Sequence, residues 1–266
     1  MIYSVDKDAS EVLEAVRSTG VIITQEHKNY VHFIIRELRY SGVWDKIKAM
    51  YGFVGGTASS HKWNWKDLRD LDVAYRLTFP NGMTHNSNGI QGNGTNQYAR
   101  TFFIPSTNFV SKDNLSFAIN VKKKVTIPNW DFGSANNTGA GGGAGGLGNI
   151  RCACFTDLAY SSGMAGADVR TLRSNAGYSL VVSRTNSSNY NIMSEDLKMN
   201  IINTSVALNS IELGIMTQVT SATGFEANPS DAIVNFVCIG DGLTNIELEH
   251  LYNTMTFAQK ILGRFR

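Results

Sequence analysis

The strongest structural signal in this chain lies in residues 42–79, which read GVWDKIKAMYGFVGGTASSHKWNWKDLRDLDVAYRLTF. Three features meet there: an amphipathic stretch, a Gly-Gly turn, and a connector in which aromatic and charged residues alternate. Trp44, Ile47 and Tyr51 fall at helical spacing, so we expect a short helix that ends at Gly52. The segment contains no pattern of catalytic side chains, which favours a scaffold over a reaction centre.

The residues before this segment also carry helical signals. Asp8 followed by Glu11 has the form of an N-terminal cap, and Thr24 can cap a second helix. In that second helix the apolar residues repeat at helical spacing: Val31, Ile34, Ile35 and Leu38. We therefore predict an N-terminal helical segment over residues 1–55. Because its apolar stripes are narrow, we expect it to serve attachment or oligomerisation, which predicts a homo-oligomer.

The pattern changes to strands after the junction. Leu115, Phe117 and Ile119 alternate with small or polar residues, as in a half-buried strand. Turn-forming residues separate this strand from further strand patterns at 150–154, 178–184, 211–215 and 233–239. Such spacing is typical of an antiparallel sandwich or jelly roll, so we predict a mainly β fold with the sandwich over residues 56–243. The glycine-rich stretch 139–148 lacks the lysine and hydroxyl residue of a phosphate-binding loop.

A capping box marks the start of a C-terminal helix. Thr244 and Glu247 have the required spacing. The apolar stripe that follows consists of Leu248, Leu251, Tyr252, Met255, Ala258 and Leu262. We predict that residues 244–266 form this helix and that it packs on the N-terminal helices. The alternative is that the stripe packs on a partner protein.

Composition narrows the classes of function. The 266 residues carry a formal net charge of +2, and the lysine cluster at 122–124 stands alone. A broad basic surface for nucleic acid is therefore not expected. No apolar run reaches the length of a membrane span, and the first residues lack the pattern of a secretory signal. We expect synthesis in a cytoplasm and no membrane insertion.

The cysteine pattern predicts reduced thiols rather than a disulfide or a metal site. Cys152 and Cys154, two positions apart on a strand, point to the same face and cannot readily bond to each other. With Cys238 they are expected to be small buried side chains. The five histidines do not supply the closely spaced pairs that a zinc site needs, so we expect no metal and no cofactor.

Several segments together resemble a family of bacteriophage virion proteins: residues 43–58, 61–64, 69–72, 93–98, 105–108, 114–117 and 239–244. The resemblance covers residues 40–130 and 230–266 well. It implies a structural protein of tailed phages, including the crAss-like phages of gut bacteria, with a concanavalin A-like (lectin/glucanase-type) jelly roll. It also implies a place in the virion after assembly in the bacterial host cytoplasm, with other virion proteins as partners. It carries no catalytic residues across.

Glycosidase activity is the enzymatic question that this resemblance raises. Glucanases with this fold resemble one another in a Glu-x-Asp-x-x-Glu strand, and a retaining glycosidase needs two closely placed carboxyl groups. The chain has no such strand and no Gly-x-Ser-x-Gly nucleophile elbow. We therefore predict that the chain is not an enzyme. Our first hypothesis is a non-enzymatic decoration or fibre subunit attached to the capsid or the tail.

The alternative hypothesis is a carbohydrate-binding, receptor-recognition (adhesin) module on the same fold, directed at host surface glycans. Aromatic faces bind sugar rings by stacking, and amide-rich loops supply hydrogen bonds. Trp130 and Tyr98 are the candidate sugar-contact aromatics, and we expect Trp130 to be exposed. Trp63 and Trp65 alternate on one face, so they are expected to anchor the sheet to its base helices.

Overall fold

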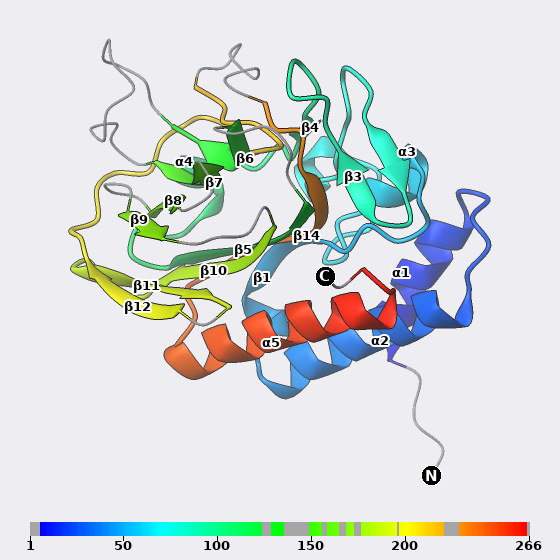
Figure 1. Cartoon of the computed structure of the whole chain (residues 1–266). Helices are drawn as coiled ribbons and strands as arrows, with labels where there is room; N and C mark the ends of the chain where they lie inside the picture. Colours follow the sequence, from blue (N-terminus) through cyan, green and yellow to red (C-terminus); the bar gives the residue numbers. More distant parts are fainter. Residues whose placement is uncertain are drawn as a thin grey trace.

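The computed structural model describes residues 6–123, 129–135, 149–155, 159–164, 169–172, 177–195, 197–220 and 229–264. Two β-sheets face each other, and long helices lie along the outer side of one of them (Figure 1). The ladders between the named strands are all antiparallel within this described part of the chain.

The larger sheet carries the helices. Its strands are β1 (Ile47–Tyr51), β2 (Thr84–Asn86), β3 (Gly89–Gln91), β5 (Leu115–Lys123), β10 (Tyr178–Arg184), β11 (Asn189–Ser194), β12 (Leu197–Ile202) and β14 (Ile233–Gly240). The order of the described strands is β12-β11-β10-β5-β14-β3-β2. β1 and β3 both pair with the same strand, β14, at its two ends.

The smaller sheet covers the other side of the sandwich. Its strands are β4 (Ala99–Arg100), β6 (Asn129–Ser134), β7 (Ile150–Phe155), β8 (Ala159–Met164), β9 (Val169–Leu172) and β13 (Gly214–Ile215). In the described residues these follow the order β4-β13-β6-β7-β8-β9. The sequence pattern at 211–215 therefore contains a strand of two residues, and its side chains Leu213 and Ile215 are nevertheless buried.

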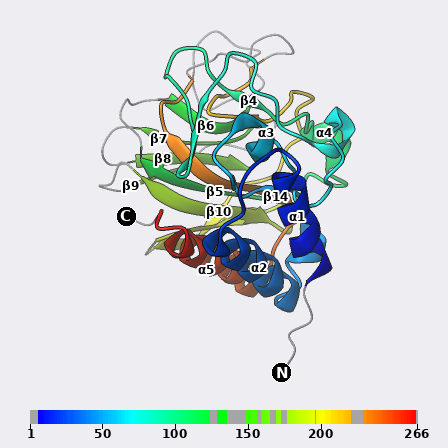
Figure 2. The same cartoon turned by 90° about the vertical axis from the view of Figure 1, so that its right-hand side faces the viewer.

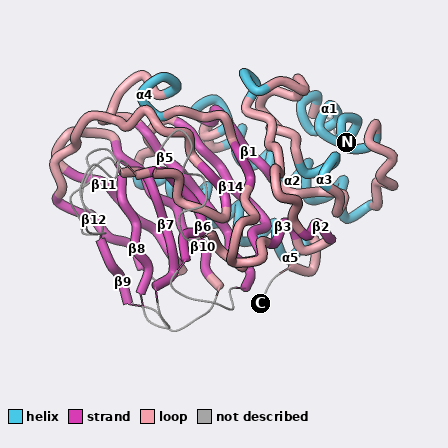
Figure 3. The backbone as a smooth tube through the Cα atoms, turned by 90° about the horizontal axis from the view of Figure 1, so that it is seen from above, coloured by secondary structure: helices cyan, strands magenta, loops and turns pink. Residues whose placement is uncertain are grey.

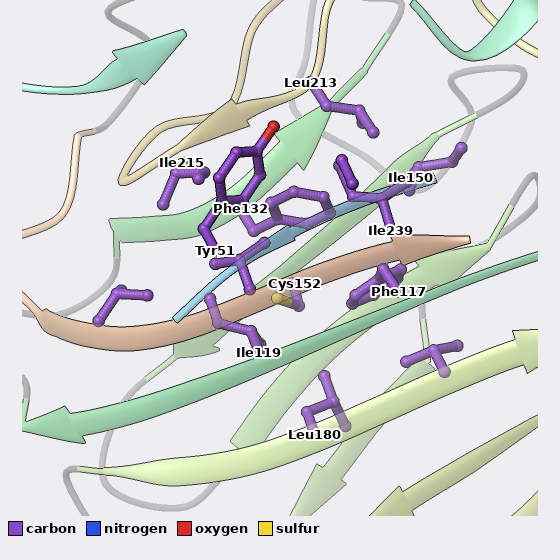
Figure 4. Packing of buried hydrophobic residues seen from close by; sticks show 14 of the residues in the cluster. Tyr51, Phe117, Ile119, Phe132, Ile150, Cys152, Leu180, Leu213, Ile215 and Ile239 are labelled. Atoms are coloured by element: carbon purple, nitrogen blue, oxygen red, sulfur yellow. The ribbon is translucent and has the colours of Figure 1, made fainter. Parts of the chain in front are cut away.

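Apolar side chains from both sheets fill the space between them (Figure 4). Because side chains alternate along a strand, Phe117 and Ile119 of β5 point into this space. Phe132 of β6 meets Phe117 there, with ring centroids 5.2 Å apart. The predicted fold class is confirmed: a mainly β, jelly-roll-like sandwich with helices near both ends of the chain.

The helices account for most of the remaining regular structure. They are α1 (Lys7–Arg17), α2 (Gln25–Tyr40), α3 (Ala58–His61), α4 (Pro105–Asn108) and α5 (Asn245–Ile261), with 3₁₀ turns η1 (Trp44–Lys46) and η2 (Asp72–Ala74). α2 and α5 lie side by side against the outer face of the larger sheet (Figure 2). Viewed from above, α1, α2 and α3 gather at the end of the molecule away from β9 and β12 (Figure 3).

A second hydrophobic core lies between the larger sheet and these helices. Phe236 and Cys238 of β14 face it, together with Ile34 of α2 and Met255 of α5. Phe236 is buried as the strand pattern predicts, but it lies under the helices rather than between the sheets. The helices at the N-terminus therefore contribute to the folded unit. Their predicted role in attachment remains a prediction.

Two local predictions in the N-terminal region are wrong. Asp6, not Asp8, caps α1, and the Asp8 carboxylate instead accepts a hydrogen bond from Trp44 Nε1 at 2.8 Å. Residues 47–51 form strand β1 rather than a helix, so strand structure begins inside the segment assigned to helices. The physical reason is that β1 is covered on both faces. Its apolar residues therefore do not alternate, and their spacing imitates that of a helix.

The predicted C-terminal helix is present as α5, which spans Asn245–Ile261 within the predicted residues 244–266. Thr244 and Glu247 form the capping box of α5, and the helix packs against α2. Cys152 and Cys238 are buried, whereas the side chain of Cys154 lies outside the described part of the structure. The glycine-rich stretch 139–148 also lies outside it.

Candidate functional site

A polar cleft opens where the second core ends, between the C-terminal half of α5 and the outer face of the larger sheet. Its volume is about 420 Å³. The lining residues are Asn120, Lys122, Ser179, Glu195, Tyr252, Asn253, Thr256, Phe257, Gln259, Lys260 and Arg264. We call it the α5 cleft. Figure 1 shows α5 running beneath β10 and β11, and residues of α5 contact both strands.

The floor of the cleft is polar because the outward-facing positions of β5 change character along the strand. Ala118 packs in the second core, but the next two outward positions are Asn120 and Lys122. Asn120 Nδ2 donates a hydrogen bond to Ser179 Oγ on the neighbouring strand β10. Lys122 Nζ donates to Asn88 Oδ1 at 2.6 Å. The sheet therefore presents fixed amide, hydroxyl and ammonium groups.

One wall of the cleft is a mixed face of α5. Phe257 lies off the apolar stripe of the helix and is 51% exposed, whereas Tyr252 lies on the stripe and is buried. The Phe257 ring contacts Phe33 of α2, with centroids 5.1 Å apart. This contact fixes an accessible aromatic face at the mouth of the cleft.

Gln259 is the most unusual residue of this wall because a polar side chain occupies the buried stripe. It is 1% exposed. Its Nε2 donates to Tyr30 Oη at 3.2 Å and to the Met255 carbonyl at 3.4 Å. Its Oε1 is buried and has no hydrogen-bond donor among the described residues. An unpaired buried carbonyl oxygen of this kind costs about 1–3 kcal/mol, so the site is incomplete as it stands.

Arg264 closes the far end of the cleft and is 2% exposed. Its Nε donates to the Ser87 carbonyl at 2.6 Å, and its Nη2 donates to the Phe53 carbonyl at 2.6 Å. Its Nη1 donates to the carbonyls of Gly52 and Asn235. Burial lowers the pKa of the Arg264 guanidinium from its ordinary value. The bonds to Gly52 and Phe53 join Arg264 to the junction between β1 and α3.

A histidine pair lies near that junction. His61 Nε2 accepts a hydrogen bond from the Gly56 backbone N–H at 3.0 Å, so its proton resides on Nδ1, which lies 3.1 Å from His85 Nδ1. Burial lowers the pKa of His61 well below its ordinary value, and burial also lowers the pKa of His85. The pair is therefore held in the neutral form. Neither histidine lines the α5 cleft.

The sequence-predicted sugar-contact aromatics lie elsewhere. Trp130 is 7% exposed, and the Arg151 guanidinium lies 4.4 Å from the centroid of its ring. Tyr98 is 8% exposed. The expectation of an exposed Trp130 is therefore wrong, because neighbouring side chains cover the indole. Neither residue lines the α5 cleft.

The tryptophans of the junction behave as anchors, as the sequence predicts. Trp65 is buried in the second core and meets Tyr30 edge-on, with centroids 6.0 Å apart. Trp63 packs against the same core, and the Lys62 ammonium lies 4.5 Å from its ring centroid. Gly52 accommodates Trp65, since a Cβ at that position would lie 2.2 Å from the indole.

The sequence contains two signals for the α5 cleft. Gln259 interrupts the apolar stripe of the C-terminal helix, and Phe257 stands outside it. Within the described residues, no group of three or more His, Cys, Asp or Glu side chains could hold a metal ion. No described helix is long and apolar enough to cross a membrane.

No protein-family model matches the chain, and no curated protein sequence matches it. Among solved structures, the chain is similar to Trypanosoma rangeli sialidase in complex with sialic acid, at 9% identity and a TM-score of 0.52. That match covers 89% of this chain and 40% of the sialidase. The chain thus spans less than half the length of the sialidase.

Two further solved structures show a weaker likeness. Domain 4 of AbnA, an extracellular GH43 arabinanase from Geobacillus stearothermophilus, in complex with arabinotriose, matches at 14% identity and a TM-score of 0.49, over 78% of this chain and 98% of the domain. The Ruminococcus gnavus IT-sialidase CBM40 bound to α2,3-sialyllactose matches at 9% identity and a TM-score of 0.39, over 53% of this chain and 82% of that one. At such identities, the likeness to the T. rangeli sialidase bears on the β-sandwich fold alone.

Proposed function

We propose that this chain is a non-enzymatic carbohydrate-binding module and that the α5 cleft is its binding site. The observation that carries the proposal is the combination of an exposed aromatic ring with fixed amide and hydroxyl groups in one concave site. Its volume of about 420 Å³ suits a small-molecule ligand. Sugars need both kinds of surface, because their rings have apolar C–H faces and polar edges.

Both kinds of surface line the cleft. Phe257 on α5 offers a ring face for stacking. Asn120 and Ser179 on the sheet, with Thr256 on α5, offer hydrogen-bond donors and acceptors to hydroxyl groups. A ligand that lies against Phe257 therefore has polar partners along its edge.

The number of acidic side chains in the cleft favours sugar binding without hydrolysis. Glu195 is the single carboxylate among its described lining residues. The common glycosidase mechanism uses a pair of carboxyl groups, one on each side of the scissile bond. We therefore expect no release of reducing sugar from bacterial polysaccharides incubated with the protein.

The test of carbohydrate binding is a glycan array followed by calorimetric titration of the best ligand. Phe257→Ala removes the exposed ring and should weaken binding at least tenfold. Tyr40→Ala is the matched control, because Tyr40 is an 86% exposed aromatic of α2 that does not line the cleft. The proposal fails if the array retains no glycan, or if both variants bind as tightly as the parent protein.

We also propose that the chain is a structural component of a phage virion, attached to capsid or tail and assembled as a homo-oligomer with other virion proteins. The resemblance of residues 43–58 and 239–244 to phage virion proteins supports this role. These segments include β1 and the end of β14, which pair with each other, so the resemblance falls on the structural junction of the fold. Mass spectrometry and immunogold labelling of purified particles test the proposal, and absence of the chain from particles would refute it.

A further inference from the structure

The described lining residues of the α5 cleft carry more positive than negative charge. Among its described lining residues, three side chains are cationic, Lys122, Lys260 and Arg264, and one is anionic, Glu195. Lys122 donates to an amide oxygen, and Arg264 donates to backbone carbonyls. Two of the three cations therefore have neutral partners. Their charge remains available to a ligand, and low solvent access around Arg264 strengthens its field.

The amide of Gln259 adds a requirement for a hydrogen-bond donor on the ligand. The Tyr30 hydroxyl donates to the Gly52 carbonyl at 3.2 Å, so it can only accept a bond from Gln259. This fixes the nitrogen of the Gln259 amide toward Tyr30 and leaves Oε1 as the acceptor without a donor. A ligand hydroxyl is a donor of the right kind for this oxygen.

From these groups, and resting on the proposed carbohydrate-binding function, we infer that the α5 cleft selects an acidic sugar. Such a ligand carries a carboxylate for Lys122 and the neighbouring positive charge, a hydroxyl for Gln259 Oε1, and an apolar ring face for Phe257. A neutral sugar would offer the hydroxyl for Gln259 Oε1 and the ring face for Phe257, but it would offer no carboxylate for Lys122. The cleft therefore discriminates through charge, while the aromatic face and the amide supply affinity that both kinds of sugar share.

The test compares glucuronate and N-acetylneuraminate with glucose by saturation-transfer NMR and calorimetry on the full chain. We expect the acidic sugars to bind at least tenfold more tightly than glucose, with an advantage that shrinks as ionic strength rises. Lys122→Gln should reduce this advantage at least fivefold. Lys198→Gln is the matched control, because Lys198 is a strand lysine outside the cleft.

Each outcome separates the inference from the function on which it rests. Equal binding of acidic and neutral sugars, with loss of both in Phe257→Ala, would overturn the charge selectivity and leave carbohydrate binding intact. An acidic preference unchanged in Lys122→Gln would overturn the selectivity assigned to this cleft. Absence of all sugar binding would overturn both. Thermal melting of each variant identifies any loss of fold, and in that case Lys122→Met, which keeps the aliphatic stem, replaces Lys122→Gln.

Discussion

Replacement of Ile34 by alanine measures how far the N-terminal helices belong to the folded unit. Ile34 is fully buried on α2, in the core that α2 shares with α5 and the larger sheet. A helix that served only for attachment would tolerate this change. A helix that completes a core would not, because the substitution removes three buried carbon atoms and leaves a cavity.

The expected loss is about 2–5 kcal/mol in the free energy of unfolding. That is a large part of the roughly 5–15 kcal/mol that a typical domain has in total. With a urea m-value of about 3 kcal/mol per molar, the unfolding midpoint should fall by about 1 M or somewhat more. Ile22→Ala is the matched control: Ile22 precedes α2 and is 86% exposed, so its loss should stay within about 0.5 kcal/mol.

Urea denaturation followed by circular dichroism and by tryptophan fluorescence measures both variants. Agreement of the two probes would show that helices and sandwich unfold together. The reasoning is refuted if Ile34→Ala unfolds at the same urea concentration as the parent protein. Deletion of residues 1–40 then extends the test. The structure predicts an unstable chain, whereas a folded chain that no longer self-associates would favour a pure attachment role.

Three further predictions concern buried polar groups. Arg264→Met should destabilise the protein by about 3 kcal/mol in urea denaturation, because it leaves buried carbonyls without their charged donor; a change below about 1 kcal/mol would contradict this. Because burial holds the pKa of His61 and His85 below the ordinary value in the folded state, the unfolded chain takes up the proton first as the pH falls. The melting temperature should therefore be steady above about pH 6.5 and decline below it, and this decline should be shallower in His61→Gln. Burial raises the pKa of Cys238 to about 12, so a thiol reagent should label this residue only after unfolding, when three thiols should be counted; rapid labelling of Cys238 in the native protein would contradict its burial.

The sequence by itself determined the elements whose signals are local. The alternation in 115–119 and the run 178–184 predicted β5 and β10, and the capping box at Thr244 predicted the start of α5. These predictions succeed because caps and side-chain periods depend on neighbours within a few residues along the chain. The mainly β class follows from the same periods.

Only the tertiary structure decided that residues 47–51 form a strand. Their apolar spacing fits a helix, but β14 offers an unpaired edge and the two cores bury both faces of the segment. The hydrogen-bond partner lies nearly two hundred residues away in the chain, so no local pattern could indicate it. The burial of Trp130 beneath Arg151 could not be predicted for the same reason. A tryptophan within a polar stretch of sequence is expected to be exposed, and only the tertiary structure shows which side chains cover it.

The candidate site was the least accessible to sequence reasoning. It joins Asn120 of β5, Ser179 of β10 and the C-terminal half of α5, three segments with no proximity along the chain. The sequence contained only the irregularity of the helix, a glutamine on its apolar stripe and a phenylalanine beside it. The cleft itself arises from tertiary packing. The apolar contact between α5 and the sheet ends where the outward side chains of β5 become polar.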